Sequence, residues 1–175
     1  MKTALLLRHA KSAWGNPALP DHERPLNDRG ERVADLMASH IARKCPRPDI
    51  VLCSTATRTR QTLAPLVHRL GSPAPPISLE KNLYLASEAA LLTRLQALAD
   101  DISTVLLIGH NEGIGQLAET LAGQGLPPLL KALWQKFPTG ALAVLQVRTE
   151  RWAGLAPGSA ELVAFVRPRD LDERA

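Results

Sequence analysis

Aromatic residues are scarce in this sequence, making up 3% of its 175 residues, so aliphatic side chains must fill any core. Two cysteines, Cys45 and Cys53, are too few for a disulfide framework, and the apolar run around Cys53 predicts a buried free thiol. The apolar run before Arg8 is too short for a signal peptide, and no run approaches the length of a membrane span. We therefore expect a cytoplasmic protein with no membrane partner.

Several catalytic signatures are also missing. There is no GxxxxGK[ST] loop, no GxGxxG after the first apolar run and no GxSxG elbow. The five histidines show no HxxxH-like spacing and no carboxylates cluster with His9 and His110, which predicts no metal site and no cofactor. The 21 Lys and Arg residues are dispersed among 17 Asp and Glu, without a basic run, so we expect no nucleic-acid partner. An anionic substrate or a phosphorylated partner fits this charge equally well.

What is present is an alternation of strand and helix patterns. Apolar, branched runs predict buried parallel strands at Ala4 to Leu7, Ile50 to Cys53 and Thr104 to Ile108. Two later runs, Leu142 to Val147 and Leu162 to Val166, predict strands joined as a hairpin across Pro157-Gly158. The length suits one domain, and the alternation predicts an α/β protein, a three-layer α/β/α sandwich.

Four amphipathic helices are expected between these strands. Asn27 is the predicted N-cap of the first helix, and the second starts at Thr57 and contains Pro65, which predicts a kink or a late start. The apolar faces of the four helices are formed by Val33, Leu36, Met37 and Ile41; by Leu63, Leu66, Val67 and Leu70; by Leu91, Leu92, Leu95 and Leu98; and by Ile114, Leu117, Ala118 and Leu121.

Unusual polar residues follow each of the three predicted parallel strands. They are Arg8-His9, the stretch from Ser54 to Thr62 that contains Arg58, and Gly109-His110-Asn111. Because the carboxyl ends of parallel strands meet at one edge of a sheet, these side chains should converge. Taken singly, each histidine could be structural and Arg58 a solvated surface residue; together they predict an anion site.

The start of the second helix strengthens this expectation. Ser54 and Thr57 are predicted caps there, and a cation in the first turn, such as Arg58, opposes the helix dipole unless a bound anion compensates it. Arg60 should turn away to the surface. Two arginines and two histidines, one of them protonated, would match a dianionic phosphoryl group.

These residues resemble the histidine phosphatase, or phosphoglycerate mutase-like, superfamily. The matching motifs are Arg8-His9-Ala10; Ser54, Arg58, Gln61 and Thr62; and Gly109-His110. Further matches to the small phosphohistidine phosphatase branch are Arg24-Pro25-Leu26 before a turn at Gly30, Leu83-Tyr84 before a leucine-rich helix, and Gly109-His110-Asn111. The resemblance implies a phosphoglycerate mutase-like fold over one domain, residues 1–175, without a large cap insertion.

The resemblance further implies a metal-independent phosphatase in which His9 becomes a covalent phosphohistidine. Arg8, Arg58 and His110 would hold the phosphoryl oxygens. Phosphohistidine on a protein is the expected substrate, because the position of the family's usual acid falls near Asn82 and an imidazole leaving group needs no strong acid. A small phosphorylated metabolite, hydrolysed or transferred as by a mutase, and a non-catalytic phospho-binding module remain alternatives.

Other residues are assigned roles around this centre. Asn16, Arg24 and Asn111 are predicted to bind substrate, and Asp21, His22 and Glu23 could join Arg24 at the rim. Lys11 is expected to be a solvated loop residue. Glu80 and Glu88 are the candidate proton donors, although either could be an ordinary surface residue beside a helix.

Overall fold

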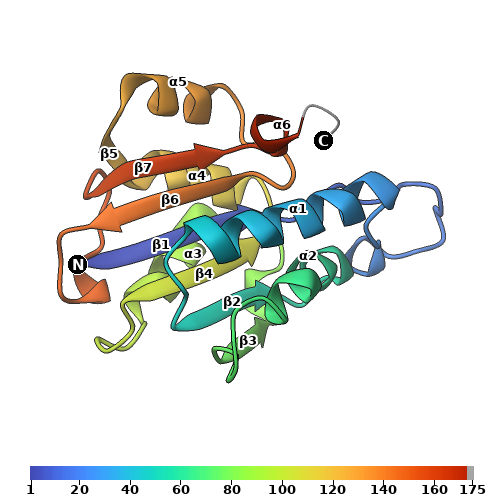
Figure 1. Cartoon of the computed structure of the whole chain (residues 1–175), viewed down its shortest axis with the longest axis horizontal. Helices are drawn as coiled ribbons and strands as arrows, with labels where there is room; N and C mark the ends of the chain where they lie inside the picture. The colour runs from blue at the N-terminus through green and yellow to red at the C-terminus, as the bar shows by residue number, and fades with distance from the viewer. Residues whose placement is uncertain (173–175) are drawn as a thin grey trace.

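The three apolar runs form the centre of a seven-stranded sheet in the computed structural model, which describes residues 1–172 (Figure 1). They are β1 (Lys2–Arg8), β2 (Ile50–Ser54) and β4 (Thr104–Gly109). β4 lies between β2 and β1 and is parallel to both, as the sequence predicts. Their side chains are buried on both faces, which explains why the runs are continuously apolar rather than alternating.

Four further strands complete the sheet, in the order β3-β2-β4-β1-β6-β7-β5. β6 (Leu142–Val147) and β7 (Ala160–Val166) form the predicted antiparallel pair, and β6 is also antiparallel to β1. The two edge strands, β3 (Ile77–Glu80) and β5 (Ala122–Gly125), run parallel to β2 and β7 and carry no clear strand pattern in the sequence.

Helices cover both faces of this sheet, and the three-layer expectation is confirmed. In Figure 1, α1 (Asp28–Lys44) and α2 (Thr57–Val67) lie in front of the sheet, with α3 (Glu88–Gln96) and α4 (Gly113–Leu121) behind it. Leu5 and Leu7 of β1 face the first pair, whereas Leu6 belongs to the core shared with the second pair. The remaining helices are α5 (Pro127–Gln135) and α6 (Pro168–Leu171), with short 3₁₀ turns η1 (Asp21–Glu23), η2 (Lys81–Leu83) and η3 (Trp152–Gly154). No helix among residues 1–172 has the length and hydropathy of a membrane span.

The start of α1 confirms one local prediction and corrects another. The side chain of Asn27 accepts a hydrogen bond from the backbone N–H of Gly30, so it caps the helix. Gly30 itself lies in the first turn of α1, not in a separate turn. A Cβ at Gly30 would lie 2.0 Å from the carbonyl oxygen of Lys11, so the glycine allows α1 to pack directly against the loop that follows β1.

The start of α2 also differs from expectation. The helix begins at Thr57 with Pro65 inside it, so the proline does not delay its start. Its N-cap is Ala56, and no side chain of the described residues caps the helix; the Ser54 hydroxyl accepts from the backbone N–H of Ala56 and lies against His110. Cys45 and Cys53 are both free, and Cys53 is buried as predicted.

Candidate active site

Strand register brings the ends of β1, β2 and β4 to the same level. Arg8 lies opposite Gly109, and Cys53 lies opposite Ile108. The residues that follow are therefore neighbours, and the rings of His9 and His110 lie 5.3 Å apart between centroids. The convergence expected from the sequence is present in the structure.

A cavity of about 330 Å³ opens at this edge, and we call it the strand-end pocket. Its lining contains all four predicted catalytic residues and the predicted binding residues Arg24 and Asn111. The complete lining is Arg8, His9, Lys11, Ser12, Trp14, Asp21, Arg24, Arg58, Leu85, His110, Asn111 and Thr139. Asn16 is not part of it; its side-chain carbonyl accepts a hydrogen bond from Ala18 within an exposed turn. The assignment of Asn16 to substrate binding is therefore not supported by its position.

His9 is held in one orientation by its own backbone neighbour. Its Nδ1 lies 2.7 Å from the carbonyl oxygen of Ala10. A carbonyl only accepts hydrogen bonds, so Nδ1 carries the ring proton and Nε2 carries the lone pair. Burial, reinforced by Arg58 and Arg8, lowers the pKa of His9 to about 4, which leaves the ring neutral near pH 7.

The Gln-Thr pair of α2 fixes the loop that carries His9. The hydroxyl of Thr62 accepts a hydrogen bond from the backbone N–H of Ala10 and donates to the carbonyl of Arg58. The side-chain oxygen of Gln61 accepts from the backbone N–H of Leu26, on the far side of the same loop. These two residues therefore position the loop that carries His9 against α2 without lining the pocket.

His110 is oriented by Ser54, whose hydroxyl lies 2.8 Å from Nε2. The same hydroxyl accepts a hydrogen bond from the backbone N–H of Ala56, and its own hydrogen can be donated to Nε2, an arrangement in which the proton of His110 lies on Nδ1. Burial, with His9 and Arg58 nearby, lowers the pKa of His110 to about 3. The ring is therefore neutral, which corrects the expectation of a protonated histidine in the free site.

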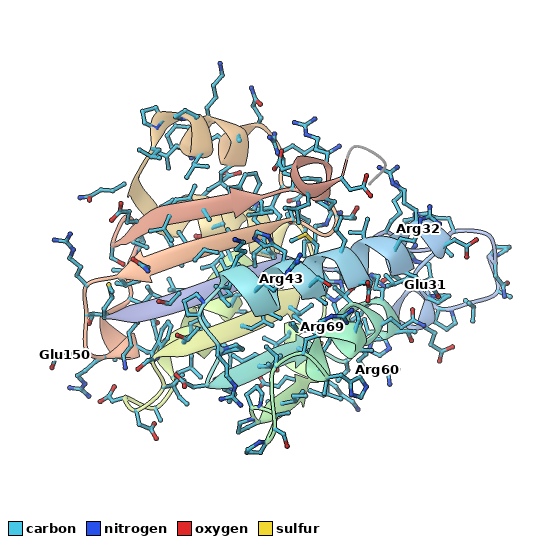
Figure 2. All side chains as sticks on the ribbon, viewed as in Figure 1. Glu31, Arg32, Arg43, Arg60, Arg69 and Glu150 are labelled. Atoms are coloured by element: carbon cyan, nitrogen blue, oxygen red, sulfur yellow. The ribbon has the colours of Figure 1, made fainter. Side chains whose placement is uncertain are left out.

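Arg58 is buried, 3% exposed, and already has an anionic partner. Its Nη1 donates to the backbone carbonyl of Asp21 and its Nη2 to the Asp21 carboxylate, at 2.7 and 3.0 Å. The charge that compensates this cation at the start of α2 is thus a carboxylate of the protein itself, supplied by η1. Arg60, two residues further on, is exposed on the outside of α2 as predicted (Figure 2).

Three buried nitrogen atoms of the strand-end pocket have no hydrogen-bond partner in the described chain. They are Nε of Arg8, Nε of Arg58 and Nδ1 of His110. Burying a donor without a partner is unfavourable, and native structures rarely leave such groups unpaired unless they serve a ligand. All three belong to residues that line the strand-end pocket close to His9, an arrangement that suits an oxyanion.

Asp21 is the one carboxyl in the strand-end pocket lining of the described residues. It is held by the hydroxyl of Tyr84 and by the guanidinium groups of Arg58 and Arg24, which keep its pKa well below the usual range. An ionised carboxylate that accepts hydrogen bonds from three side chains has no proton to donate. Asp21 is consequently a positioning group for the two arginines.

The predicted proton donors lie elsewhere. Glu80 forms a bidentate pair with Arg94, which lowers its pKa, and Glu88 is the first residue of α3. Neither lines the strand-end pocket, and Asn82 is exposed in η2. Their positions therefore do not support the predicted role as proton donors, because Glu80 is bound to Arg94 and Glu88 begins α3 outside the pocket lining.

The remaining lining residues are tied into the protein or form the rim. Arg24 donates to Ser12 and to the carbonyl of Ala13, and its guanidinium stacks 3.4 Å from the ring centroid of the exposed Trp14. The Asn111 amide bonds to Phe137 and Gly115, so it braces the pocket wall. Phe137 also accepts a hydrogen bond from Arg8, a role that no sequence motif indicates.

Among residues 1–172, the histidine, cysteine and acidic side chains form no group of three that could hold a metal ion. The sequence model of the histidine phosphatase superfamily (branch 1) matches residues 4–84. An uncharacterised protein of Mycobacterium tuberculosis is 40% identical over 165 residues, covering 93% of this chain and all of the relative. The chain belongs to the histidine phosphatase superfamily.

Solved structures agree with this assignment of a histidine phosphatase. A protein from Nakamurella multipartitia, named as a proposed phosphohistidine phosphatase SixA, is 34% identical, with a TM-score of 0.81 over 95% of this chain and 96% of that one. A second protein with the same proposed name, from Agrobacterium tumefaciens, is 33% identical, with a TM-score of 0.79 over 95% and 98%. The expected enzyme class, a phosphatase acting on phosphorylated substrates, and the phosphoglycerate mutase-like fold are confirmed.

Proposed function

We propose that this histidine phosphatase hydrolyses phosphohistidine on a protein, through a covalent phosphoryl group on His9 and without a metal ion. The observation that carries the proposal is the neutral His9 ring, with Nδ1 bound to Ala10 and Nε2 without a partner in the described chain, beside three unpaired buried nitrogens. We also propose that residues 1–175 act as one catalytic domain, with no large cap.

In the first step, the Nε2 lone pair of His9 attacks the phosphorus atom, and a new N–P bond forms as the N–P bond of the substrate breaks. The electron pair of that bond stays on the leaving imidazole, which takes its proton from solvent. Arg8, Arg58 and the Nδ1–H of His110 would donate to the phosphoryl oxygens and stabilise the charge of the transition state. The Ala10 carbonyl stabilises the phosphorylated His9 ring, which bears a positive charge.

In the second step, water attacks the phosphorylated His9, the Nε2–P bond breaks, and inorganic phosphate and a proton are released. The ring returns to its neutral form with its proton still on Nδ1. His110 entered the cycle neutral, and a bound dianion would raise its affinity for a proton. Neither step requires a metal ion.

The lack of a protonated carboxyl among the described lining residues supports an imidazole leaving group. The sole lining carboxyl among the described residues, Asp21, is ionised and bonded to Tyr84, Arg58 and Arg24. An alkoxide leaving from a phosphomonoester needs a proton donor, whereas an imidazole leaves far more readily. The names of the two solved relatives, proposed SixA phosphohistidine phosphatases, support the same substrate class.

A substrate panel tests this proposal. We expect kcat/KM for a phosphohistidine peptide and for phosphoramidate to exceed that for a sugar phosphate by at least about 10²-fold, the usual worth of a missing general acid. EDTA should leave turnover unchanged, and tungstate or vanadate should inhibit competitively. Faster hydrolysis of the sugar phosphate would favour a small phosphomonoester instead, and loss of activity on chelation would overturn the metal-independent mechanism.

A further inference from the structure

A second cavity, of about 490 Å³, adjoins the strand-end pocket, and we call it the basic pocket. The two share three lining residues: Arg8, Lys11 and Thr139. The rest of the basic pocket comes from the start of α1, the end of α5 and the short helix α6. It is larger than the strand-end pocket, and a group bound in it would lie beside a phosphoryl group held at Arg8.

The lining of the basic pocket has one sign of charge. Its six cations are Arg8, Lys11, Arg29, Lys136, Arg167 and Arg169, and no carboxyl belongs to the lining within residues 1–172. Asp170, just outside, pairs with Arg167 at 2.9 Å and offsets one of these charges, and Arg29 has an interaction of its own. Lys11, Lys136 and Arg169 are exposed and form no ion pair within the described chain.

Such a concentration of charge is unlike the rest of the sequence. The chain carries 21 basic and 17 acidic residues, intermixed along its length, yet six of the basic ones meet here from positions between 8 and 169. A cleft lined by one sign of charge raises the local concentration of ligands of the opposite sign. The basic pocket is therefore suited to anionic groups.

The uncharged part of the lining narrows the class of ligand. Val33 and Pro168 are buried and supply apolar surface, and no aromatic side chain lines this cavity among the described residues. Recognition of nucleobases relies on aromatic stacking, which is lacking here. Apolar surface flanked by lysine and arginine suits the aliphatic stems and carboxylates of acidic side chains.

We propose that the basic pocket binds acidic residues next to the phosphohistidine of the protein substrate. This inference rests on the proposed function and deepens it, because it names the sequence context that the enzyme prefers. With the phosphoryl group on His9, Arg8 and Arg58, the flanking chain passes Lys11 and Thr139 and places its carboxylates near Lys136 and Arg169.

Two phosphohistidine peptides of equal length test this, one with glutamate and one with glutamine flanking the phosphorylated residue. We expect kcat/KM to favour the glutamate peptide about 3- to 10-fold, the size expected for two exposed ion pairs. The preference should fall as salt is raised, because exposed charges are screened. The double variant K136Q/R169Q should bring the ratio of the two peptides close to one.

The matched control is Arg43→Gln, an exposed cation near the opposite end of α1 from Arg32 (Figure 2). It should retain the full preference. Since all three substituted side chains are exposed, the melting temperature should confirm that the variants fold. A ratio of one in the unaltered enzyme, or a preference that survives in K136Q/R169Q, would overturn the assignment of the basic pocket while leaving phosphohistidine hydrolysis intact.

Two further arms separate the other possibilities. If phosphoramidate is hydrolysed and neither peptide is, the protein substrate and the flanking preference both fail. If the peptides are equal, but a sugar bisphosphate is preferred over its monophosphate and K136Q/R169Q removes that preference, the basic pocket serves a small molecule and our proposal is wrong.

Discussion

The strand-end pocket and the basic pocket share a wall, yet they are built in different ways. In the first, His9, Arg58 and His110 are buried, and backbone or side-chain hydrogen bonds fix each of them. In the second, Lys11, Lys136 and Arg169 are exposed, and none is ion-paired in the described chain. Chemistry requires fixed atoms in a desolvated site, whereas recognition of a variable flank tolerates mobile side chains.

The largest expected effect is at the centre of the strand-end pocket. The variant His9→Ala removes the attacking nitrogen, so kcat should fall by at least about 10⁴-fold. His68→Ala, which removes an exposed histidine at the end of α2, should behave as the unaltered enzyme. Turnover of phosphoramidate by both variants checks this. Unchanged turnover by His9→Ala would show that the reaction does not depend on His9, and the strand-end pocket would then differ from the basic pocket in no catalytic respect.

The next effect compares two arginines of one helix. Arg58→Gln should lower kcat/KM about 10²- to 10³-fold, as loss of an oxyanion-binding group does, and should weaken tungstate binding. Arg60→Gln, two residues along α2 and exposed, should change neither quantity. Similar kinetics for both variants would mean that Arg58 has no catalytic role, despite its burial and its ion pair with Asp21.

A smaller effect concerns the support of the strand-end pocket. Gly30→Ala places a methyl group 2.0 Å from the Lys11 carbonyl, so α1 or the loop before it must shift, and the free energy of unfolding should drop by about 1–3 kcal/mol. Gly15→Ala has no atom within 4 Å of the new methyl group and should cause no such loss. Urea unfolding of the two variants measures the difference. Equal stability would show that this close packing is not required.

The last effect is electrostatic and concerns the pH dependence of the strand-end pocket. The pKa of His9 is lowered to about 4 from an ordinary 6.5, mainly by burial. Below pH 6.5 the His9 ring binds a proton in the unfolded chain but stays neutral in the native protein. The free energy of unfolding should therefore fall as the pH drops from 6.5 towards 4. Nuclear magnetic resonance titration should place the midpoint of His9 near 4. A midpoint near 6.5 would contradict a neutral, desolvated nucleophile.

The sequence predicted the parts of the fold that local patterns encode. The runs of β1, β2 and β4 are continuously apolar, Asn27 caps α1, and the polar residues after each strand meet because parallel strands end at one edge. The edge strands escaped prediction for physical reasons. β3 is short and partly exposed, and β5 contains two glycines in its four residues, so neither has an apolar pattern.

The contacts that define the site were harder to predict, because they join distant residues. The Asp21–Arg58 pair spans 37 positions, and it replaced the bound anion that we expected to neutralise Arg58. His110 was expected to be charged, yet its burial beside His9 and Arg58 keeps it neutral. The basic pocket draws on residues from both ends of the chain, so intermixed charges in the sequence concealed it.

The most direct test of the central claim is to trap the phosphorylated enzyme. After rapid mixing with a phosphohistidine peptide and alkaline quenching, we expect a phosphoryl group that is labile in acid, stable in base and located by peptide mapping on His9. The same experiment with His9→Ala should yield none. Phosphate found on another residue, or turnover with no phosphorylated enzyme at any time point, would contradict the mechanism.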